Sequence, residues 1–392
     1  MKVLISGAGI GGLTAALCLE QAGHDVELFE QAQQFSEIGA GIQCGANALK
    51  VMDHLGLLTQ LEALAVAPER AEFCDHASAE ILYTAPFGNA YRTRYGAPYL
   101  HILRADLVGV LLAAFRQRKA NGMHLGAQVT HYTEQADGVQ AHFADGSIVN
   151  GDCLIAADGI RSKIRSQLVG AIEPRFTGNV AWRGVLPADQ LPANFMQKVV
   201  RNFVGPNKHM VIYYLRQQQL VNFVGVVENK GWQDDSWVSK APWEELKADF
   251  EGWHPMVQAV IDGMCKDECY RWALFDHKPI KRWSSDRVTL LGDAAHATLP
   301  FMASGAAMAI EDGRILQRAL DQASDIKQGL ALYQANRFKR TKEIQNSSRQ
   351  LGKLYHINNR LALKLAFKAL GAIGKRKERF LPEYDANIVE LL

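Results

Sequence analysis

The sequence predicts an α/β fold in which a Rossmann-like dinucleotide-binding domain carries an inserted β-rich domain and a helical C-terminus. Three observations predict this architecture. The chain opens on a strand, a glycine-rich turn and a helix; residues 176–274 are rich in short strand-like and aromatic segments; and the residues after 326 have a helical pattern. At 392 residues the chain is long enough for two or three domains.

The first thirty residues contain a strand, a glycine turn, a helix and a second strand that ends in a carboxylate. Gly7, Gly9 and Gly12 fill the GxGxxG spacing directly after the first strand. In this motif the first glycine allows a tight turn, the second lets a pyrophosphate approach the backbone, and the third lets the helix pack close to the strand. Glu30 ends the second strand, where it can accept hydrogen bonds from the ribose hydroxyls of an adenosine.

The composition argues against several classes of protein. The formal net charge of +2 gives no electrostatic case for nucleic acid binding. The six cysteines are scattered without a cluster of Cys and His, so we expect reduced thiols in a cytoplasmic protein and no metal site. Because the chain begins directly with a strand, we expect no signal peptide, and because no apolar run approaches about 18 residues, we expect no transmembrane segment.

The region between the N-terminal unit and the β-rich segment predicts three further features. Residues 73–99 are short of regular pattern and rich in aromatic and turn residues, and we expect them to form strands that leave the first domain. Residues 104–119 predict a helix with Asp106 as its N-cap. Residues 128–149 predict a hairpin that turns at Asp145-Gly146.

Two further motifs follow strand-like apolar segments. Asp158-Gly159 comes after residues 153–157, and Gly292-Asp293 comes after residues 288–291. A helix is expected from about residue 306 to 319. In spacing and order, these motifs and the N-terminal glycine unit resemble the three motifs of the FAD-dependent aromatic hydroxylases, the single-component flavoprotein monooxygenases that act on salicylate, hydroxybenzoates and 6-hydroxynicotinate. The string Gly292-Asp293-Ala294-Ala295-His296 is that family's GDAAH without change.

This resemblance covers nearly the whole chain and implies its domain organisation. It implies a Rossmann-like FAD-binding domain of the glutathione-reductase type, interrupted by a substrate domain and followed by a helical basic tail. The FAD-binding domain would comprise residues 1–72, 98–175 and 275–350, the β-rich substrate domain residues 73–97 and 176–274, and the tail residues 351–392.

The resemblance also implies the reaction. In that family NADH or NADPH reduces FAD, the reduced flavin captures O2 as a C4a-hydroperoxide, and a hydroxyl is transferred to an electron-rich aromatic ring. The protein must therefore exclude water and help a phenol to become a phenolate. A flavoprotein oxidase or dehydrogenase on the same fold is an alternative, against which the Asp158-Gly159 and Gly292-Asp293 motifs favour the monooxygenase.

The family motifs imply which residues contact the cofactors. Gln31 and Val129 are expected at the adenosine end, and Asp293 at the ribityl chain. The helix that starts near Ala306 would direct its positive end at the flavin, although Ala303-Ser304-Gly305 replaces the usual Gly-Gln-Gly or Ala-Gln-Gly ahead of it. The complete set of implied cofactor-binding residues is Gly7, Gly9, Gly12, Glu30, Gln31, Arg104, Val129, Asp158, Gly159, Asp293, Pro300, Gly305 and Ala306.

The candidate catalytic residues are His209, Tyr213 and Gln43. Strand alternation places His209 and Tyr213 on one face, and in the hydroxybenzoate and hydroxynicotinate branch a His and a Tyr at the matching positions face the substrate. His209 is thus the candidate for hydrogen-bonding or deprotonating the substrate hydroxyl. Gln43 stands where the hydroxynicotinate enzymes carry a histidine, which argues against 6-hydroxynicotinate as the substrate.

Phe301 and Phe223 are the expected ring-packing walls of the substrate pocket. A substrate carboxylate would need a cation, and Arg183, Arg92 and Arg216 are available. Our hypothesis from the sequence is a phenolic, monocyclic aromatic acid, and decarboxylating hydroxylation of salicylate is the first reaction to test. Nothing in the sequence separates NADH from NADPH, and the oligomeric state is open.

The basic tail predicts an amphipathic helix. Lys353, Arg360, Lys364, Lys368 and Lys375 recur at helical spacing and would form one stripe, with apolar residues over much of the remaining surface. The broad apolar arc favours burial against the enzyme's own body. The alternative is peripheral membrane contact, which would fit hydroxylation of a lipid-soluble quinone precursor.

Overall fold

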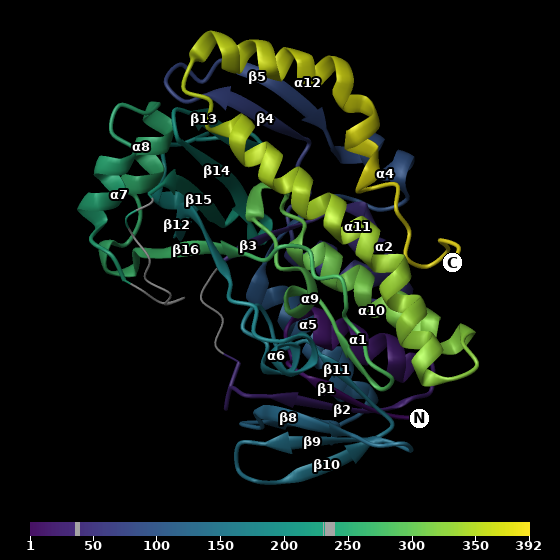
Figure 1. Cartoon of the computed structure of the whole chain (residues 1–392). Helices are drawn as coiled ribbons and strands as arrows, with labels where there is room; N and C mark the ends of the chain where they lie inside the picture. The colour runs from purple at the N-terminus through teal and green to yellow at the C-terminus, as the bar shows by residue number, and fades with distance from the viewer. Residues whose placement is uncertain (36–39, 230, 232–239) are drawn as a thin grey trace.

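The computed structural model describes residues 1–35, 40–229, 231 and 240–392, without the side chains of 372–378. Two large sheets lie at opposite ends of the molecule, and long helices run between them (Figure 1). This is the α/β architecture expected from the sequence, with a parallel sheet, a sheet-rich insertion and a helical C-terminus.

The first sheet is parallel and has the order β17-β11-β1-β2-β7. Its strands come from distant parts of the chain: β1 (Lys2–Ser6), β2 (Asp25–Glu30), β7 (Met123–Leu125), β11 (Cys153–Ala156) and β17 (Val288–Leu290). Because parallel strands end at the same edge, the segments that follow β1, β11 and β17 lie side by side. These segments are the three motifs found in the sequence.

Helices cover this sheet at close range. Gly313 in α10 (Gly305–Gln322) abuts α1 (Ile10–Gln21), since a Cβ at Gly313 would lie 2.8 Å from the backbone nitrogen of Ala15. The other helices of this region are α2 (Ala46–His54), α3 (Leu58–Leu64), α5 (Arg104–Arg118) and α6 (Lys163–Val169). The expectation that Asp106 is the N-cap of α5 was wrong, because the helix already begins at Arg104 and Asp106 lies in its first turn.

A smaller antiparallel sheet contains the predicted hairpin. Its strands are β8 (Val129–Glu134), β9 (Val139–Phe143) and β10 (Ile148–Gly151). The turn between β9 and β10 includes Asp145-Gly146, and Gly146 has φ +85°, a conformation that glycine adopts at no steric cost. The hairpin predicted at this turn is therefore confirmed.

The second large sheet has seven strands in the order β16-β12-β15-β14-β13-β4-β5. Its strands are β4 (Arg70–Asp75), β5 (Ile81–Pro86), β12 (Arg175–Pro187), β13 (Val200–Gly205), β14 (Lys208–Leu215), β15 (Leu220–Glu228) and β16 (Tyr270–Asp276). Helices α7 (Trp243–Asp249) and α8 (Pro255–Asp262) pack on one face. The early strands β4 and β5 therefore join the later β-rich region, whereas α4 (Gly88–Tyr95) is helical where strands were expected.

The C-terminal region consists of two helices, α11 (Ile326–Tyr355) and α12 (Arg360–Phe380), with a break between them. The single basic stripe expected from the sequence was wrong, because Lys353 lies on α11 and the other four basic residues lie beyond the break. Among the described side chains of α12, Leu363 and Phe367 are buried against the seven-stranded sheet, and Leu361 and Leu365 are exposed. No helix in the described part of the chain is long and apolar enough to cross a membrane.

Candidate active site

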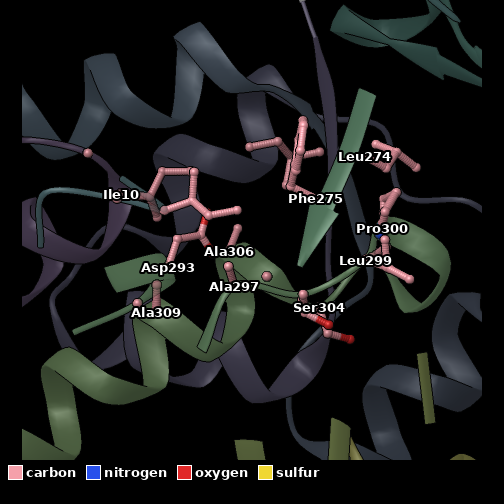
Figure 2. A pocket seen from close by; sticks show the side chains of 18 of the residues that line it. Ile10, Leu274, Phe275, Asp293, Ala297, Leu299, Pro300, Ser304, Ala306 and Ala309 are labelled. Atoms are coloured by element: carbon pink, nitrogen blue, oxygen red, sulfur yellow. The ribbon is translucent and has the colours of Figure 1, made fainter. Parts of the chain in front are cut away.

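A cavity of about 660 Å³ lies between the two large sheets. One side is formed by the residues that follow β1, β11 and β17, and the other by the cavity-facing side of β12, β14 and β15. Figure 2 shows part of the lining, including Ile10, Asp293, Pro300, Ser304 and Phe275. Ten of the residues predicted as catalytic or cofactor-binding line this cavity: Gly9, Gln43, Arg104, Gly159, His209, Tyr213, Asp293, Pro300, Gly305 and Ala306.

Of the three glycines that define the GxGxxG motif, two pack against backbone and one faces open space. Gly7 has φ +101°, and a Cβ there would lie 2.3 Å from the Ala157 carbonyl oxygen. A Cβ on Gly12 would lie 1.9 Å from the Gly7 carbonyl oxygen. A Cβ on Gly9 would meet nothing within 4 Å, and no side chain caps α1 there. The start of α1 is therefore open toward the cavity, an arrangement that suits a phosphate group.

Glu30 lies beside this turn but does not line the cavity. Its two carboxylate oxygens accept hydrogen bonds from the backbone nitrogens of Ala8 and Ala32, each at 2.9 Å. Gln31 is exposed and accepts a hydrogen bond from Gln128, and Val129 is buried in the core. These three residues, predicted at an adenosine, thus lie outside the cavity lining.

The Asp158-Gly159 turn is held by a hydrogen bond between the Asp158 carboxylate and the backbone of α6. Asp158 accepts a hydrogen bond from the Lys163 backbone nitrogen at 3.1 Å, and burial raises the pKa of its carboxyl above the ordinary value. Gly159 lines the cavity, whereas Asp158 does not. The helix after this turn, α6, begins at Lys163, and the Ser162 side chain caps it by accepting the Arg165 N–H.

The Gly292-Asp293 turn is fixed by a carboxylate from another helix. Gly292 has φ +63° and donates its backbone N–H to Asp312 Oδ2 at 3.0 Å. The same oxygen lies 2.6 Å from His296 Nε2, and Arg337 Nε donates to Asp312 Oδ1 at 2.6 Å. This arrangement holds Asp293, the first residue of α9 (Asp293–His296), at the cavity wall.

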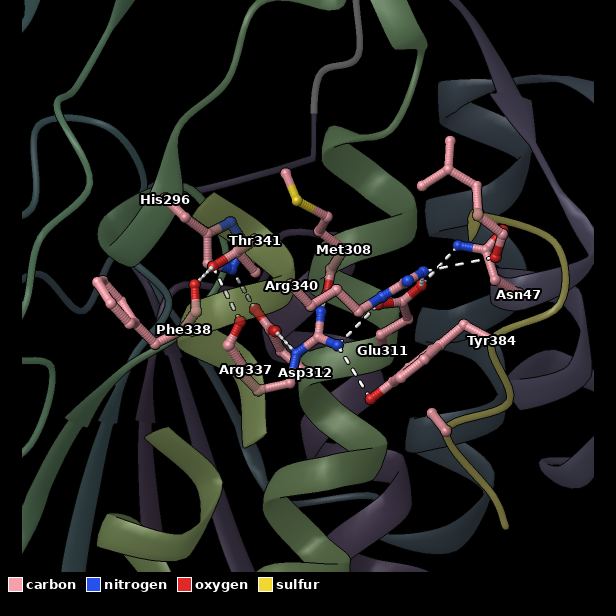
Figure 3. Close-up of polar contacts among 12 residues, drawn as sticks. Asn47, His296, Met308, Glu311, Asp312, Arg337, Phe338, Arg340, Thr341 and Tyr384 are labelled. Atoms are coloured by element: carbon pink, nitrogen blue, oxygen red, sulfur yellow. Dashed lines mark hydrogen bonds and ion pairs between the residues drawn. The ribbon is translucent and has the colours of Figure 1, made fainter. Parts of the chain in front are cut away.

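Asp312 belongs to a buried network of charges (Figure 3). Its neighbour Glu311 pairs with Arg340 at 2.7 Å and Arg337 at 2.8 Å, and accepts from Asn47 at 2.6 Å. Burial alone would raise the pKa of Asp312, but His296 and Arg337 outweigh it and lower the pKa to about 2. The carboxylates are therefore ionised and paired inside the core, which ties α10 to α11 and to the turn.

The loop before α10 curves along the cavity. Ala303 has φ +49°, and the Ser304 hydroxyl donates to the Met302 carbonyl at 2.8 Å within the same loop. Pro300, Gly305 and residues 303–306 face the cavity, with α10 starting at Gly305. The side chain of the serine that departs from the family pattern thus stabilises the loop by a hydrogen bond to the loop backbone.

His209, Val211 and Tyr213 of β14 line the cavity, as the strand alternation predicts. His209 Nδ1 lies 2.8 Å from His356 Nε2, and burial, followed by the influence of His356, holds the His209 pKa well below its ordinary value. Burial raises the pKa of the Tyr213 hydroxyl, and Gln43 Oε1 accepts a hydrogen bond from the Tyr99 hydroxyl at 2.7 Å. The cavity therefore presents a neutral imidazole beside a neutral phenol.

The two phenylalanines expected to wall the pocket do not line it. Phe301 lies behind His209, with ring centroids 5.3 Å apart. Phe223 points to the opposite face of the sheet, where it packs with Trp182 and Phe250. The physical reason is alternation along β15, which turns Val224 and not Phe223 toward the cavity.

Arg183 is the one of the three candidate arginines that faces the cavity. Its guanidinium carbon lies 4.4 Å from the centre of the Trp272 ring, and its buried Nε has no hydrogen-bond partner. Burial lowers the pKa of Arg183 to about 10, so the side chain remains a cation at neutral pH. Arg92 and Arg216 instead pair with Glu62 and Asp106.

A family model described as an FAD binding domain matches residues 1–348. The chain is 36% identical over 353 residues to a 6-hydroxynicotinate 3-monooxygenase from Bordetella bronchiseptica, covering 88% of this chain and 90% of the relative. It is also 36% identical over 390 residues to a 3-hydroxybenzoate 6-hydroxylase from Polaromonas naphthalenivorans, covering 98% and 94%. The chain belongs to the FAD-dependent aromatic hydroxylase family.

Solved structures agree with this assignment. HpxO from Klebsiella pneumoniae, complexed with FAD and uric acid, has a TM-score of 0.85 at 28% identity, covering 98% of this chain and 96% of HpxO. A salicylate hydroxylase substrate complex has a TM-score of 0.84 at 27% identity, with the same two coverages. This hydroxylase is therefore an FAD-dependent monooxygenase with NADH or NADPH as electron donor and with O2 and a small aromatic molecule as substrates.

Sequence reasoning missed the residues that hold this hydroxylase's site from a distance. Arg165 is buried and donates to the carbonyls of Ile160 and Ala294, which links two of the motifs. The Glu311 and Asp312 network had a signal in the sequence, since two adjacent carboxylates directly follow the apolar run 306–310 at the start of the helix. No pattern in the sequence pointed to His356, because its partner His209 is 147 positions away.

The glycine turn generates a prediction that separates folding from cofactor binding. Gly9→Ala should change the free energy of unfolding of the FAD-free protein by less than about 0.5 kcal/mol, because a Cβ there meets open space, yet it should weaken FAD binding at least about tenfold. Gly12→Ala should lower the free energy of unfolding and also weaken FAD binding, because its Cβ would clash with the Gly7 carbonyl. FAD titration and urea unfolding measure the two effects; wild-type FAD affinity in Gly9→Ala would contradict the assignment of this turn.

The buried network predicts acid sensitivity. Folding lowers the Asp312 pKa from its ordinary 3.8 to about 2, which adds about 2 kcal/mol to the free energy of unfolding. This contribution is present above about pH 4 and is lost as the pH falls toward 2. Asp312→Asn should cost about 3–5 kcal/mol near pH 7, and less at pH 3, in urea unfolding. The control Asp286→Asn removes an exposed ion pair with Lys327 and should cost under about 0.5 kcal/mol. Equal effects of the two variants would refute the role of the network.

Proposed function

We propose that this monooxygenase hydroxylates a phenolic, monocyclic aromatic acid, and that salicylate is the first substrate to test. The observation that carries the proposal is the pairing, in one cavity, of the enclosed cation Arg183 with the neutral imidazole of His209. A carboxylate matches the first and a phenolic hydroxyl matches the second. The named relatives that act on hydroxybenzoates and the salicylate hydroxylase structure support the same class.

The strand register supports simultaneous contact with both groups. Arg183 and Val211 are each the cross-strand partner of Val224, so Arg183 stands two strands away from β14 on the same face. Two strand spacings are about 10 Å, and His209 is two residues, or about 7 Å, along β14 from Val211. The long arginine side chain can cover much of this separation, which leaves room for a single aromatic ring.

FAD fits the other side of the cavity and supplies the redox chemistry that activates O2. Gly9 and the start of α1 would receive the pyrophosphate, and Asp293 the ribityl chain. Arg104 would contact the same region. The positive N-terminal end of α10, at Gly305, would stabilise negative charge on the reduced flavin ring. Glu30 would bind the ribose with the lone pairs that Ala8 and Ala32 leave free. Asp158 would not contact FAD itself but would hold the turn that places Gly159 at the cavity.

The protein's own residues prepare the substrate. Arg183 binds and orients the carboxylate, and His209 accepts the phenol proton at Nε2, since its Nδ1 is engaged by His356. Loss of that proton makes the ring electron-rich and ready for an electrophilic hydroxyl. Val211, Val224, Val226 and Leu299 form apolar walls that exclude water.

The six cysteines are free thiols, five of them buried. Because free thiols persist in a reducing compartment, we propose that the enzyme works in the cytoplasm.

A substrate panel tests the proposed function. NADH and NADPH oxidation should be stimulated by an aromatic acid among salicylate, 3-hydroxybenzoate and 4-hydroxybenzoate, and the hydroxylated product should be found by mass spectrometry. Phenol, which lacks the carboxylate, should stimulate far less, and 6-hydroxynicotinate serves as the comparison that Gln43 disfavours. Failure of every aromatic acid to stimulate oxidation would overturn the proposal.

The carboxylate contact has its own prediction. Arg183→Met should raise KM for the aromatic acid roughly 10- to 100-fold, as expected for losing a charge-assisted hydrogen bond, while FAD remains bound. The matched control is Arg216→Met, because Arg216 is paired with Asp106 at the surface, and its KM should stay at the wild-type value. An unchanged KM in Arg183→Met would show that another residue binds the acid.

A further inference from the structure

A line of hydrogen-bonded side chains leads from the cavity wall to the surface. His209 Nδ1 lies 2.8 Å from His356 Nε2, and His356 Nδ1 lies 3.0 Å from Glu228 Oε1. The two histidines are only 2% and 7% exposed, whereas the Glu228 side chain is 38% exposed. The three side chains therefore connect the substrate cavity with solvent.

The surroundings hold the two imidazoles in this geometry. His356 lies in the break between α11 and α12, which reaches the seven-stranded sheet beside β13 and β14 (Figure 1), and its carbonyl accepts the Asn207 N–H at 3.4 Å. The rings of Phe301 and Tyr355 each lie 5.3 Å from the His209 ring. These apolar neighbours keep water away from the imidazoles and leave the hydrogen-bonded line as the path for a proton.

We infer that His356 and Glu228 form a proton relay that carries the substrate's phenol proton from His209 to solvent; the inference rests on the proposed function. The phenol O–H bond breaks and its proton binds His209 Nε2. The proton on His209 Nδ1 passes to His356 Nε2, and the proton on His356 Nδ1 passes to the Glu228 carboxylate and then to water. One proton leaves the substrate, one enters the solvent, and no electrons move.

The electrostatics of the site require such an exit. Burial lowers the pKa of both His209 and His356, so a proton that stopped on either imidazole would form a poorly solvated cation and return to the substrate. Glu228 acts in the opposite direction on the His356 pKa. Tyr355 contributes no charge, because burial raises its pKa, and Lys208 is directed to the Asp249 carbonyl. Within the described residues, Glu228 is the charged group that hydrogen-bonds this pair.

Glutamine variants separate a relay from a merely structural contact. His356→Gln and Glu228→Gln keep side chains that can hydrogen-bond but cannot pass a proton along the line. Tyr355→Phe is the matched control, because it keeps the ring beside His209 and removes only a hydroxyl that lies 3.4 Å from the Phe301 carbonyl. All three variants should retain FAD and bind 3-methoxybenzoate, which has no phenol proton, as tightly as the wild type.

The test is stopped-flow mixing of the FAD-loaded enzyme, without nicotinamide, with 3-hydroxybenzoate. Flavin absorbance reports binding, near-ultraviolet absorbance reports the phenolate, and phenol red in weak buffer reports the released proton. In the wild type and Tyr355→Phe, proton release should keep pace with phenolate formation. In His356→Gln and Glu228→Gln, binding should be unchanged and both later signals at least about tenfold slower.

The outcomes distinguish a failure of the relay from a failure of the proposed function on which it rests. Wild-type rates of phenolate formation and proton release in both glutamine variants would overturn the relay and leave the proposed function standing. If the wild-type enzyme shows no flavin response to salicylate, 3-hydroxybenzoate or 4-hydroxybenzoate, the proposed function fails and the relay fails with it. If His356→Gln does not load FAD, the partly exposed Glu228→Gln site decides the result alone.

Discussion

Asp312 is the buried carboxylate on which the geometry of the site depends. It accepts the Gly292 N–H, pairs with His296 and is held by Arg337, so one side chain joins α10, α11 and the turn that presents Asp293. A carboxylate buried at this depth is stable only when its partners are complete. The network therefore fixes the Gly292-Asp293 turn against α10 and α11 (Figure 3), and Arg165 links that turn to the segment after β11.

The two sheets divide the chemistry between them. Parallel strands end at one edge, which gathers backbone turns and helix starts suited to phosphates and to a flavin's polar groups. The antiparallel strands of the other sheet present side chains in rows, which suits recognition of a small ring through Arg183, His209 and Tyr213. A cavity between two such surfaces can hold a cofactor and a substrate face to face, and the apolar walls keep water out.

The sequence predicted the fold and the cavity-facing strand of the site because both depend on local patterns. Glycine spacing defined the turn after β1, and period-two alternation placed His209 and Tyr213 on one face. Phe223 was predicted on the wrong face of the sheet, because alternation along β15 turns Val224 toward the cavity and leaves Phe223 to pack beside α7 and α8. His356 and Arg165 could not be predicted from the sequence, since their contacts arise only when distant segments pack together.

The most direct test of this account is a crystal structure of the FAD-loaded enzyme with the aromatic acid that best stimulates nicotinamide oxidation. We predict that the ligand carboxylate lies within hydrogen-bonding distance of the Arg183 guanidinium, and that the ring hydroxyl meets His209 Nε2, with His356 and Glu228 in line behind it. A ligand whose carboxylate binds Arg104 instead, or whose hydroxyl points away from His209, would contradict the account.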